Sequence, residues 1–228
     1  MKKIVSPSHI WKAEKGLTVL LAFLVVTVFI AYPFIARPLG RFLFLICFSF
    51  LLISGAIIVF KKRLLEIVVT GIVLVSLVLH WIYFYQDAAG LAPWIAFFNF
   101  LSCCLLAIIV LLLVFREGSV TIHRITGAIA VYLLFGLMWG FLFNLIALQV
   151  PDAFKMPYAT GAYPADTLQN NLIYFSFVTL TTLGYGDILA VHPFARMLVI
   201  LEALTGQLFP AILLARLVSL EILHKNKK

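Results

Sequence analysis

Six apolar runs separated by short polar segments make up most of this 228-residue chain. About 20 apolar residues in a helix cross the hydrocarbon core of a bilayer, and the first five runs are long enough to do so without a charged residue. The pattern therefore predicts an all-α membrane protein with six transmembrane helices. The runs occupy residues 16–36, 42–60, 67–86, 88–115, 125–151 and, interrupted by Glu202 and Arg216, about 197–220.

The segment between the fifth and sixth runs, residues 151–193, does not read as a simple loop. It begins with several prolines, which predict irregular, exposed backbone. Asp166 then precedes Gln169 by three positions, a spacing typical of a capping box, so we expect a helix to open at about residue 167. A helix over 167–180 would be about 20 Å long, too short to span the bilayer.

This half-helix runs directly into the heptapeptide TTLGYGD, residues 181–187. Non-helical backbone at membrane depth is tolerated only where it is buried in protein or faces water. A strand whose successive carbonyls point to one axis needs positive φ angles, which glycine adopts cheaply. Gly184 and Gly186 therefore indicate a re-entrant loop that presents its carbonyls, and not an ordinary turn.

In this setting TTLGYGD resembles the selectivity filter of potassium channels, whose common form is TVGYG. Leu183 stands where that form has valine, and its backbone carbonyl can do the same work. The following run is similar to the inner helix of the family: Arg196 lies near its start and Gly206 lies at the place of a glycine hinge. Pro210, four residues later, would add a kink because it lacks a backbone donor.

The resemblance implies that backbone carbonyls and the Thr182 hydroxyl replace the hydration shell of a potassium ion. One chain supplies only one wall of such a filter, so a homotetramer surrounded by membrane lipids is implied. Potassium would be the permeant ligand, with no cofactor. The implied ion-binding residues are Thr182, Leu183, Gly184, Tyr185 and Gly186; the filter supports are Asp187, Tyr174 and Phe175; the gating hinge is Gly206 and Pro210; and the cavity is lined by Gln207 and Leu214.

The side chains around the filter have expected roles of their own. The Tyr185 ring is expected to point away from the axis and to pack on Tyr174 and Phe175, which stand where voltage-gated members often carry tryptophans. Tyr174 is expected to donate a hydrogen bond to Asp187. Glu202 is costly inside a membrane and is a functional candidate. A bond to Ser176 or Thr179 would make it structural, and proton sensing is the alternative.

The chain divides into a four-helix domain (1–115), a cytoplasmic linker (116–126) and a pore domain (127–228). Six-helix potassium channels suggest voltage gating, which uses about 3–4 gating charges in each subunit. Residues 88–115 contain no Lys or Arg, so gating by that mechanism is not expected. The resulting prediction is a potassium-selective channel. A weakly selective cation channel and a potassium transporter subunit are the alternatives.

Charge and composition further limit the classes of protein to which this chain can belong. The residues are 64% hydrophobic and 11% charged, against roughly a quarter charged in soluble domains. Most Lys and Arg lie before the first run, between runs two and three and runs four and five, and after the last. This bias predicts cytoplasmic termini, in a plasma or bacterial inner membrane. No basic face suggests nucleic-acid binding, and no HExxH motif or paired intramembrane carboxylates suggest an enzyme.

A few polar residues lie inside the predicted spans. His80, in the aromatic cluster that ends the third run, is expected to form hydrogen bonds at the outer interface. Ser54, Asn99 and Ser102 are expected to form hydrogen bonds between helices. The three cysteines lie within apolar runs and lack CxxC spacing, so neither a disulfide framework nor a zinc site is expected.

Overall fold

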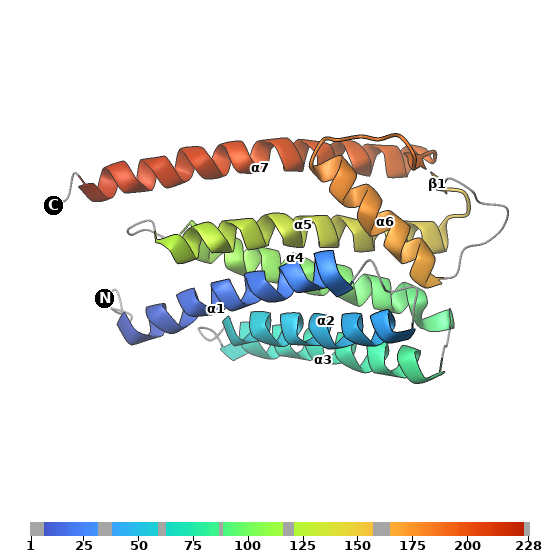
Figure 1. The fold of residues 1–228 in the computed structure, drawn as a ribbon, viewed down its shortest axis with the longest axis horizontal. Coiled ribbons are helices and arrows are strands. Elements are labelled where there is room, and N and C mark those ends of the chain that lie inside the picture. Colours follow the sequence, from blue (N-terminus) through green and yellow to red (C-terminus); the bar gives the residue numbers. More distant parts are fainter. Residues whose placement is uncertain are drawn as a thin grey trace.

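The computed structural model describes residues 7–31, 38–58, 63–86, 89–115, 121–156 and 165–225. Within these residues the chain forms seven α-helices and one short antiparallel strand pair (Figure 1). The elements in chain order are α1 (Pro7–Val25), the π-helical η1 (Val26–Ala31), α2 (Pro38–Ile58), α3 (Arg63–Gln86), the short 3₁₀-helix η3 (Ala89–Leu91), α4 (Ala92–Val114), α5 (Ile122–Gln149), β1 (Phe154–Lys155), α6 (Ala165–Leu180), β2 (Leu189–Ala190) and α7 (Pro193–Lys225).

Four of the described helices contain stretches long and apolar enough to cross a membrane, which makes this a multi-pass membrane protein. The stretches are Ile67–Gln86, Ala92–Val114, Ile122–Gln149 and Pro193–Ser219. α1 and α2 contain shorter apolar stretches, Gly16–Ile30 and Phe42–Gly55. The six predicted runs thus correspond in order to α1 to α5 and α7, and within the described residues four of them reach the length of a span.

α5 lies at the centre of the molecule, with α1 and α4 against it and with α6 and α7 on the side away from α2 and α3 (Figure 1). Its apolar stretch is 61% buried inside the chain, more than that of α3, α4 or α7. The larger core fills the space between α1, α2, α4 and α5, and includes Leu20, Leu51, Val110 and Leu134. Many large apolar side chains remain exposed on the outside of the bundle, as the composition of a membrane protein leads one to expect.

Hydroxyl groups in these helices mostly bond to their own helix. Thr27 donates to the Phe23 carbonyl, Ser49 to that of Leu45, and Thr205 to that of Leu201. Such bonds satisfy a hydroxyl that would otherwise face hydrocarbon. Ser54 follows the same pattern, donating to the Leu51 carbonyl at 2.8 Å, so its predicted role between helices is wrong.

Asn99 does form the predicted bonds between helices. Ser76 donates to Asn99 Oδ1 at 2.9 Å, and Asn99 Nδ2 lies 3.4 Å from His80 Nε2. His80 Nδ1 lies 3.0 Å from the Ser76 carbonyl oxygen. His80 therefore makes the expected hydrogen bonds, but inside the bundle and not at its surface, since it is only 8% exposed. Ser102 Oγ is buried with no hydrogen-bond partner among the described residues.

Two predicted boundaries shift in the structure, and one pair of strands is added. α5 starts at Ile122, so the second half of the predicted linker 116–126 is helical; residues 116–120 lie outside the described part. α6 starts at Ala165, and Asp166 lies within its first turn instead of capping it. The outer segment also contains β1 paired with β2, two residues each, in an otherwise all-α fold.

Candidate ion-conduction site

The short helix α6 is seated on α5 at two glycines four residues apart. A Cβ built on Gly136 would lie 2.4 Å from Phe177 Cε1, and one on Gly140 would lie 2.8 Å from the Cα of Ile173. The α5 backbone can approach α6 this closely only because both positions lack a side chain. The i, i+4 glycine spacing in GLMWG is visible in the sequence and is the signal from which this unpredicted contact could have been inferred.

The C-terminal end of α6 is held at a single carbonyl, that of Leu180. The Tyr132 hydroxyl of α5 donates to this oxygen at 3.0 Å. Gly206 of α7 packs against the same group: a Cβ there would lie 1.9 Å from the Leu180 oxygen. The structure therefore explains Gly206 by close packing of α7 on α6, where the sequence suggested a hinge.

Beyond Leu180 the backbone takes positive φ at every second residue. The angles are +60° at Thr182, +56° at Gly184 and +76° at Gly186, while Leu183 and Tyr185 have no such angle. This alternation turns successive carbonyls toward one side of the strand. The glycines have the conformation that the sequence predicted. The positive φ of Thr182 was not predicted. A threonine in the left-handed region is uncommon and indicates a locally imposed geometry.

The amide groups at the start of this strand point back to the end of α6. Thr182 N–H donates to the Thr179 carbonyl at 2.9 Å, and Leu183 N–H donates to the Val178 carbonyl at 2.9 Å. Gly184 N–H lies 3.3 Å from the same Val178 oxygen. With the amides occupied in this way, the strand leaves α6 in a fixed direction. Among the described residues no backbone amide donates to the carbonyls of Thr182 to Gly186.

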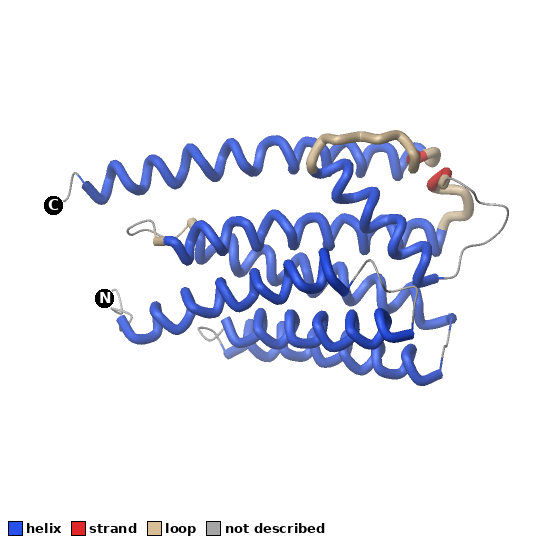
Figure 2. The backbone as a smooth tube through the Cα atoms, viewed as in Figure 1, coloured by secondary structure: helices blue, strands red, loops and turns tan. Residues whose placement is uncertain are grey.

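The whole strand from Thr181 to Asp187 is exposed in the single chain. Figure 2 shows it as a loop running alongside α7, on the side of the molecule away from α1 to α3. Leu183 is 59% and Tyr185 66% exposed. The strand is anchored again at Ile188, which is 3% exposed and whose amide donates to the Asp187 carboxylate at 3.0 Å. The fold thus presents these carbonyls at an open surface.

Tyr174 and Asp187 lie together, as the sequence suggested. Hydrogen bonding to the Asp187 carboxylate, with some desolvation, raises the pKa of the Tyr174 phenol above its ordinary value. The expected packing of Tyr185 on Tyr174 and Phe175 stays a prediction, since Tyr185 is 66% exposed in the single chain. Phe175 is buried against Phe143 and Phe154, with ring centroids 5.6 and 5.7 Å away, because those rings fill the space between α5, α6 and β1.

The start of α7 is tied to the strand pair. Arg196 Nε donates to the Ala190 carbonyl at 3.1 Å, and the Phe194 amide donates to His192 Nδ1 at 3.3 Å. Further along, most of the surface of α7 is exposed in the single chain, and only 17% of its apolar stretch is buried. Gln207 and Leu214 both lie on its exposed surface, and Pro210 lies within the helix.

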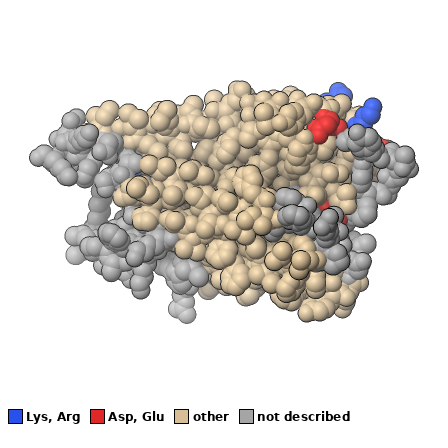
Figure 3. Space-filling view, in the orientation of Figure 1, with Lys and Arg blue, Asp and Glu red and all other residues tan. Residues whose placement is uncertain are grey.

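The coloured charges of Figure 3 gather almost entirely at one end of the molecule, where Figure 1 places β1 and the start of α7. The long face of described residues between the ends is uncharged in this view. A surface of this kind suits hydrocarbon, and the charged end suits the water–lipid boundary.

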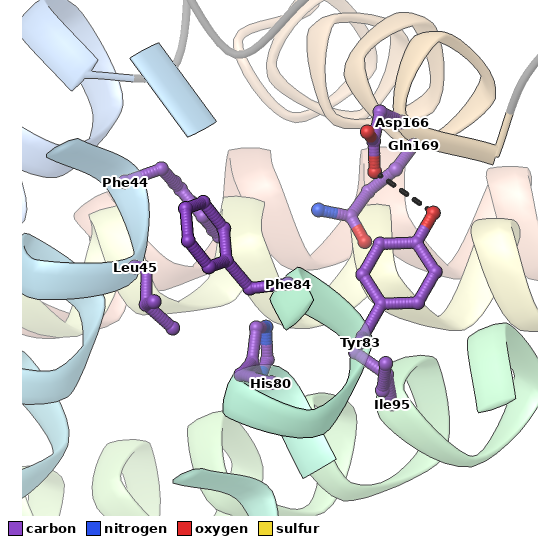
Figure 4. A pocket seen from close by; sticks show the side chains of 8 residues that line it. All are labelled: Phe44, Leu45, His80, Tyr83, Phe84, Ile95, Asp166 and Gln169. Atoms are coloured by element: carbon purple, nitrogen blue, oxygen red, sulfur yellow. Dashed lines mark hydrogen bonds between the residues drawn. The ribbon is translucent and has the colours of Figure 1, made fainter. Parts of the chain in front are cut away.

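A small cavity of about 40 Å³ lies where α2, α3 and α4 meet the first turns of α6 (Figure 4). Tyr83 of α3 donates to Asp166 of α6 at 3.2 Å across its edge. Aromatic and polar side chains line the cavity. They come both from the four-helix part and from α6, the helix that leads into the filter-like strand. The lining residues are Phe44, Leu45, His80, Tyr83, Phe84, Ile95, Asp166 and Gln169.

Replacing Tyr83 with phenylalanine is expected to lower the stability of the folded protein by about 1 kcal/mol, since a hydrogen bond to a carboxylate is lost without a change of shape. Thermal unfolding in detergent measures this loss. Tyr85→Phe is the matched control, because Tyr85 is 74% exposed and its ring contacts remain. Equal melting temperatures for both variants would contradict a role for the Tyr83–Asp166 bond.

Comparison with known proteins bears on one part of the chain. Residues 125–221 match the family model described as an ion channel. This range contains nearly all of α5 and α7, together with α6 and the filter-like strand. It covers a little under half of the chain. No curated protein and no solved structure matches the chain. The matched family is one of ion channels, in agreement with the expectation that the protein is not an enzyme.

Proposed function

We propose that this ion-channel domain conducts potassium selectively, through a pore lined by the backbone carbonyls of Thr182, Leu183, Gly184 and Tyr185 with the Thr182 hydroxyl. The single observation that carries the proposal is the alternation of positive φ at residues 182, 184 and 186. It gives a strand that can line up carbonyl oxygens as replacements for the hydration shell of a cation. The sequence TLGYG, which resembles the potassium filter, favours potassium among cations.

The position of α6 supports the same function. Its C-terminal end, at Leu180, leads directly into the proposed filter. The carbonyl end of a helix carries partial negative charge, equivalent to roughly half an elementary charge. A hydrated cation in the pore below the filter would be stabilised there before it loses its water and enters the filter.

We further propose a homotetramer. A single chain leaves the carbonyl strand at its surface and α7 only 17% buried, so neither an enclosed ion path nor a covered inner helix exists in one copy. Four copies around an axis would bring four strands together. The exposed Gln207 would then face the cavity below the filter, with Leu214 one i, i+7 step further along the same side of α7.

Two features of α7 bear on opening. Pro210 has no amide hydrogen, so the carbonyl of Gly206 loses its usual helical partner. We propose that α7 bends here, while the Gly206–Leu180 contact keeps its upper part fixed on α6. The fourth helix supplies no Lys or Arg over 92–114, so voltage is not the proposed stimulus.

The proposed setting is a plasma or bacterial inner membrane with both termini in the cytoplasm. The first turn of α1 and the last turn of α7 lie at the same end of the molecule in Figure 1, opposite the filter, which fits this orientation. Six spans would complete it, with α1 and α2 crossing among lipids alongside the four longer helices.

The test is the reversal potential of purified protein in liposomes or planar bilayers under opposed K⁺ and Na⁺ gradients. A potential that follows the K⁺ gradient, with discrete single-channel steps, supports the proposal. A potential between the two gradients would identify a weakly selective cation channel. Saturable flux without steps would identify a transporter subunit, and either of these results would overturn the assignment.

A further inference from the structure

Glu202 lies in the first third of α7 and is completely buried, with 0% exposure in the single chain. It faces α5 and α6, and not the surface where other copies would pack. A carboxylate inside a membrane protein normally pairs with a cation or with several donors. Among the described residues no Lys, Arg or His forms an ion pair with Glu202, and its Oε2 has no hydrogen-bond partner. The carboxyl group therefore lacks the partners that an anion needs.

Among the described residues its hydrogen-bond partner is Ser176 of α6, whose Oγ lies 2.5 Å from Glu202 Oε1. The same Oγ lies 2.7 Å from the backbone carbonyl oxygen of Gly136 in α5. A serine hydroxyl has one hydrogen and two acceptor lone pairs, whereas a carbonyl oxygen can only accept. If the single hydrogen points to Gly136, the contact with Glu202 needs a second hydrogen, and only the carboxyl group can supply it.

An ionised Glu202 would leave one of these two short oxygen–oxygen contacts without a hydrogen. With an ionised Glu202, Ser176 would donate to the carboxylate, and its oxygen would face the Gly136 oxygen at 2.7 Å with no hydrogen between them. Two oxygens at that distance without a shared proton repel each other. A buried anion with one donor and an unpartnered oxygen would add a large desolvation cost.

We propose that Glu202 is held as a neutral carboxylic acid that donates to Ser176, forming a chain Glu202–Ser176–Gly136 that ties α7, α6 and α5 together behind the proposed filter. Glu202 is thus a positioning residue: it acts on conduction through α6 and not on the ion. Its role in conduction rests on the proposed function, whereas its protonation state does not.

The proposal has a consequence for pH. The folded protein holds a proton that the unfolded chain would release at neutral pH, so stability is lost as pH rises and Glu202 ionises. The groups that face Glu202 from its neighbours would not reverse this sign. Tyr132 of α5 is electrostatically coupled to it and donates to Leu180, and α6 presents the non-titrating Ser176. On α7, Arg196 is engaged with Ala190.

Infrared difference spectroscopy of the full-length protein in detergent tests the protonation state directly. We expect a carboxylic-acid C=O band at neutral pH that is absent from Glu202→Gln and that disappears at alkaline pH. In Ser176→Ala the band should move to higher frequency, because the acid loses its acceptor. A wild-type spectrum without this band, measured on folded protein, would overturn the proposal whether or not the protein conducts.

The same variants test the positioning role in liposomes. Glu202→Gln can still donate from its amide, so we expect normal K⁺ flux at neutral pH and loss of the alkaline decline seen in the wild type. Glu202→Ala cannot donate, and its flux and melting temperature should both fall. Equal alkaline decline in the wild type and Glu202→Gln would contradict the role. Should no variant or wild type conduct K⁺, the infrared band alone decides the protonation state, and the proposed function fails separately.

Discussion

Gly206→Ala is expected to abolish ion flux and to destabilise the folded chain. A Cβ at this position would lie 1.9 Å from the Leu180 carbonyl oxygen, whereas ordinary van der Waals contact begins at 3.4 Å. The obstacle is backbone, so no rotamer change can relieve it. α7 and α6 would have to separate, at a cost of about 1–3 kcal/mol or more. Because α6 leads into the proposed filter, this displacement would move the carbonyls out of register.

Gly71→Ala provides the matched control. Gly71 also lies within a long apolar helix, but a Cβ there would meet nothing within 4 Å. Alanine in an open helical position is neutral or slightly stabilising. Thermal unfolding in detergent and K⁺ flux in liposomes should separate the two variants clearly. Wild-type flux through Gly206→Ala would show that the close approach of α7 to α6 is not required.

Gly184→Ala is expected to remove potassium selectivity for a different reason. A Cβ on Gly184 would meet nothing within 4 Å of the same chain, so space is not the constraint. The residue has φ +56°, a left-handed conformation that costs an L-residue roughly 1–2 kcal/mol. In an assembly this cost recurs in every copy. Relaxing it means rotating the peptide, which would turn a carbonyl away from the ion.

Gly90→Ala shares the open surroundings of Gly184 but has no left-handed backbone. It should therefore leave selectivity and flux unchanged. The measurement is the K⁺/Na⁺ reversal potential of both variants, together with the yield of folded protein to separate loss of selectivity from loss of folding. Unchanged selectivity in Gly184→Ala would refute the filter assignment and with it the proposed path of the ion.

Much of this architecture could be predicted because lipid imposes simple rules on sequence. Apolar runs located most helices to within about five residues, although α1 begins at Pro7, well before the run at 16–36. The half-helix before TTLGYGD followed from its length. The left-handed glycines were predictable because few other residues adopt that backbone. Left-handed Thr182 was not predictable from its residue type, since threonine rarely adopts this conformation.

Contacts between elements were harder to predict, because they depend on how helices turn toward each other. Asp166 read as a cap from its spacing, but in the fold it receives a bond from Tyr83, 83 residues earlier. The contact of Phe175 with Phe143 was likewise not predictable from the sequence, because it depends on which face α6 turns to α5. Glu202 and Ser176 were correctly paired as candidates, and their shared contact with Gly136 emerged only in three dimensions.

The exposed carbonyl strand has a consequence for how damage to this protein would be inherited. In the proposed homotetramer each chain contributes one of the four strands of a shared filter. No other copy can compensate for misaligned oxygens in that strand. A chain that folds and assembles but carries a faulty strand would therefore disable the intact chains beside it. A chain that fails to fold would only reduce their number. Defects at residues 182–186 should thus be dominant, and defects that prevent the chain from folding should be recessive.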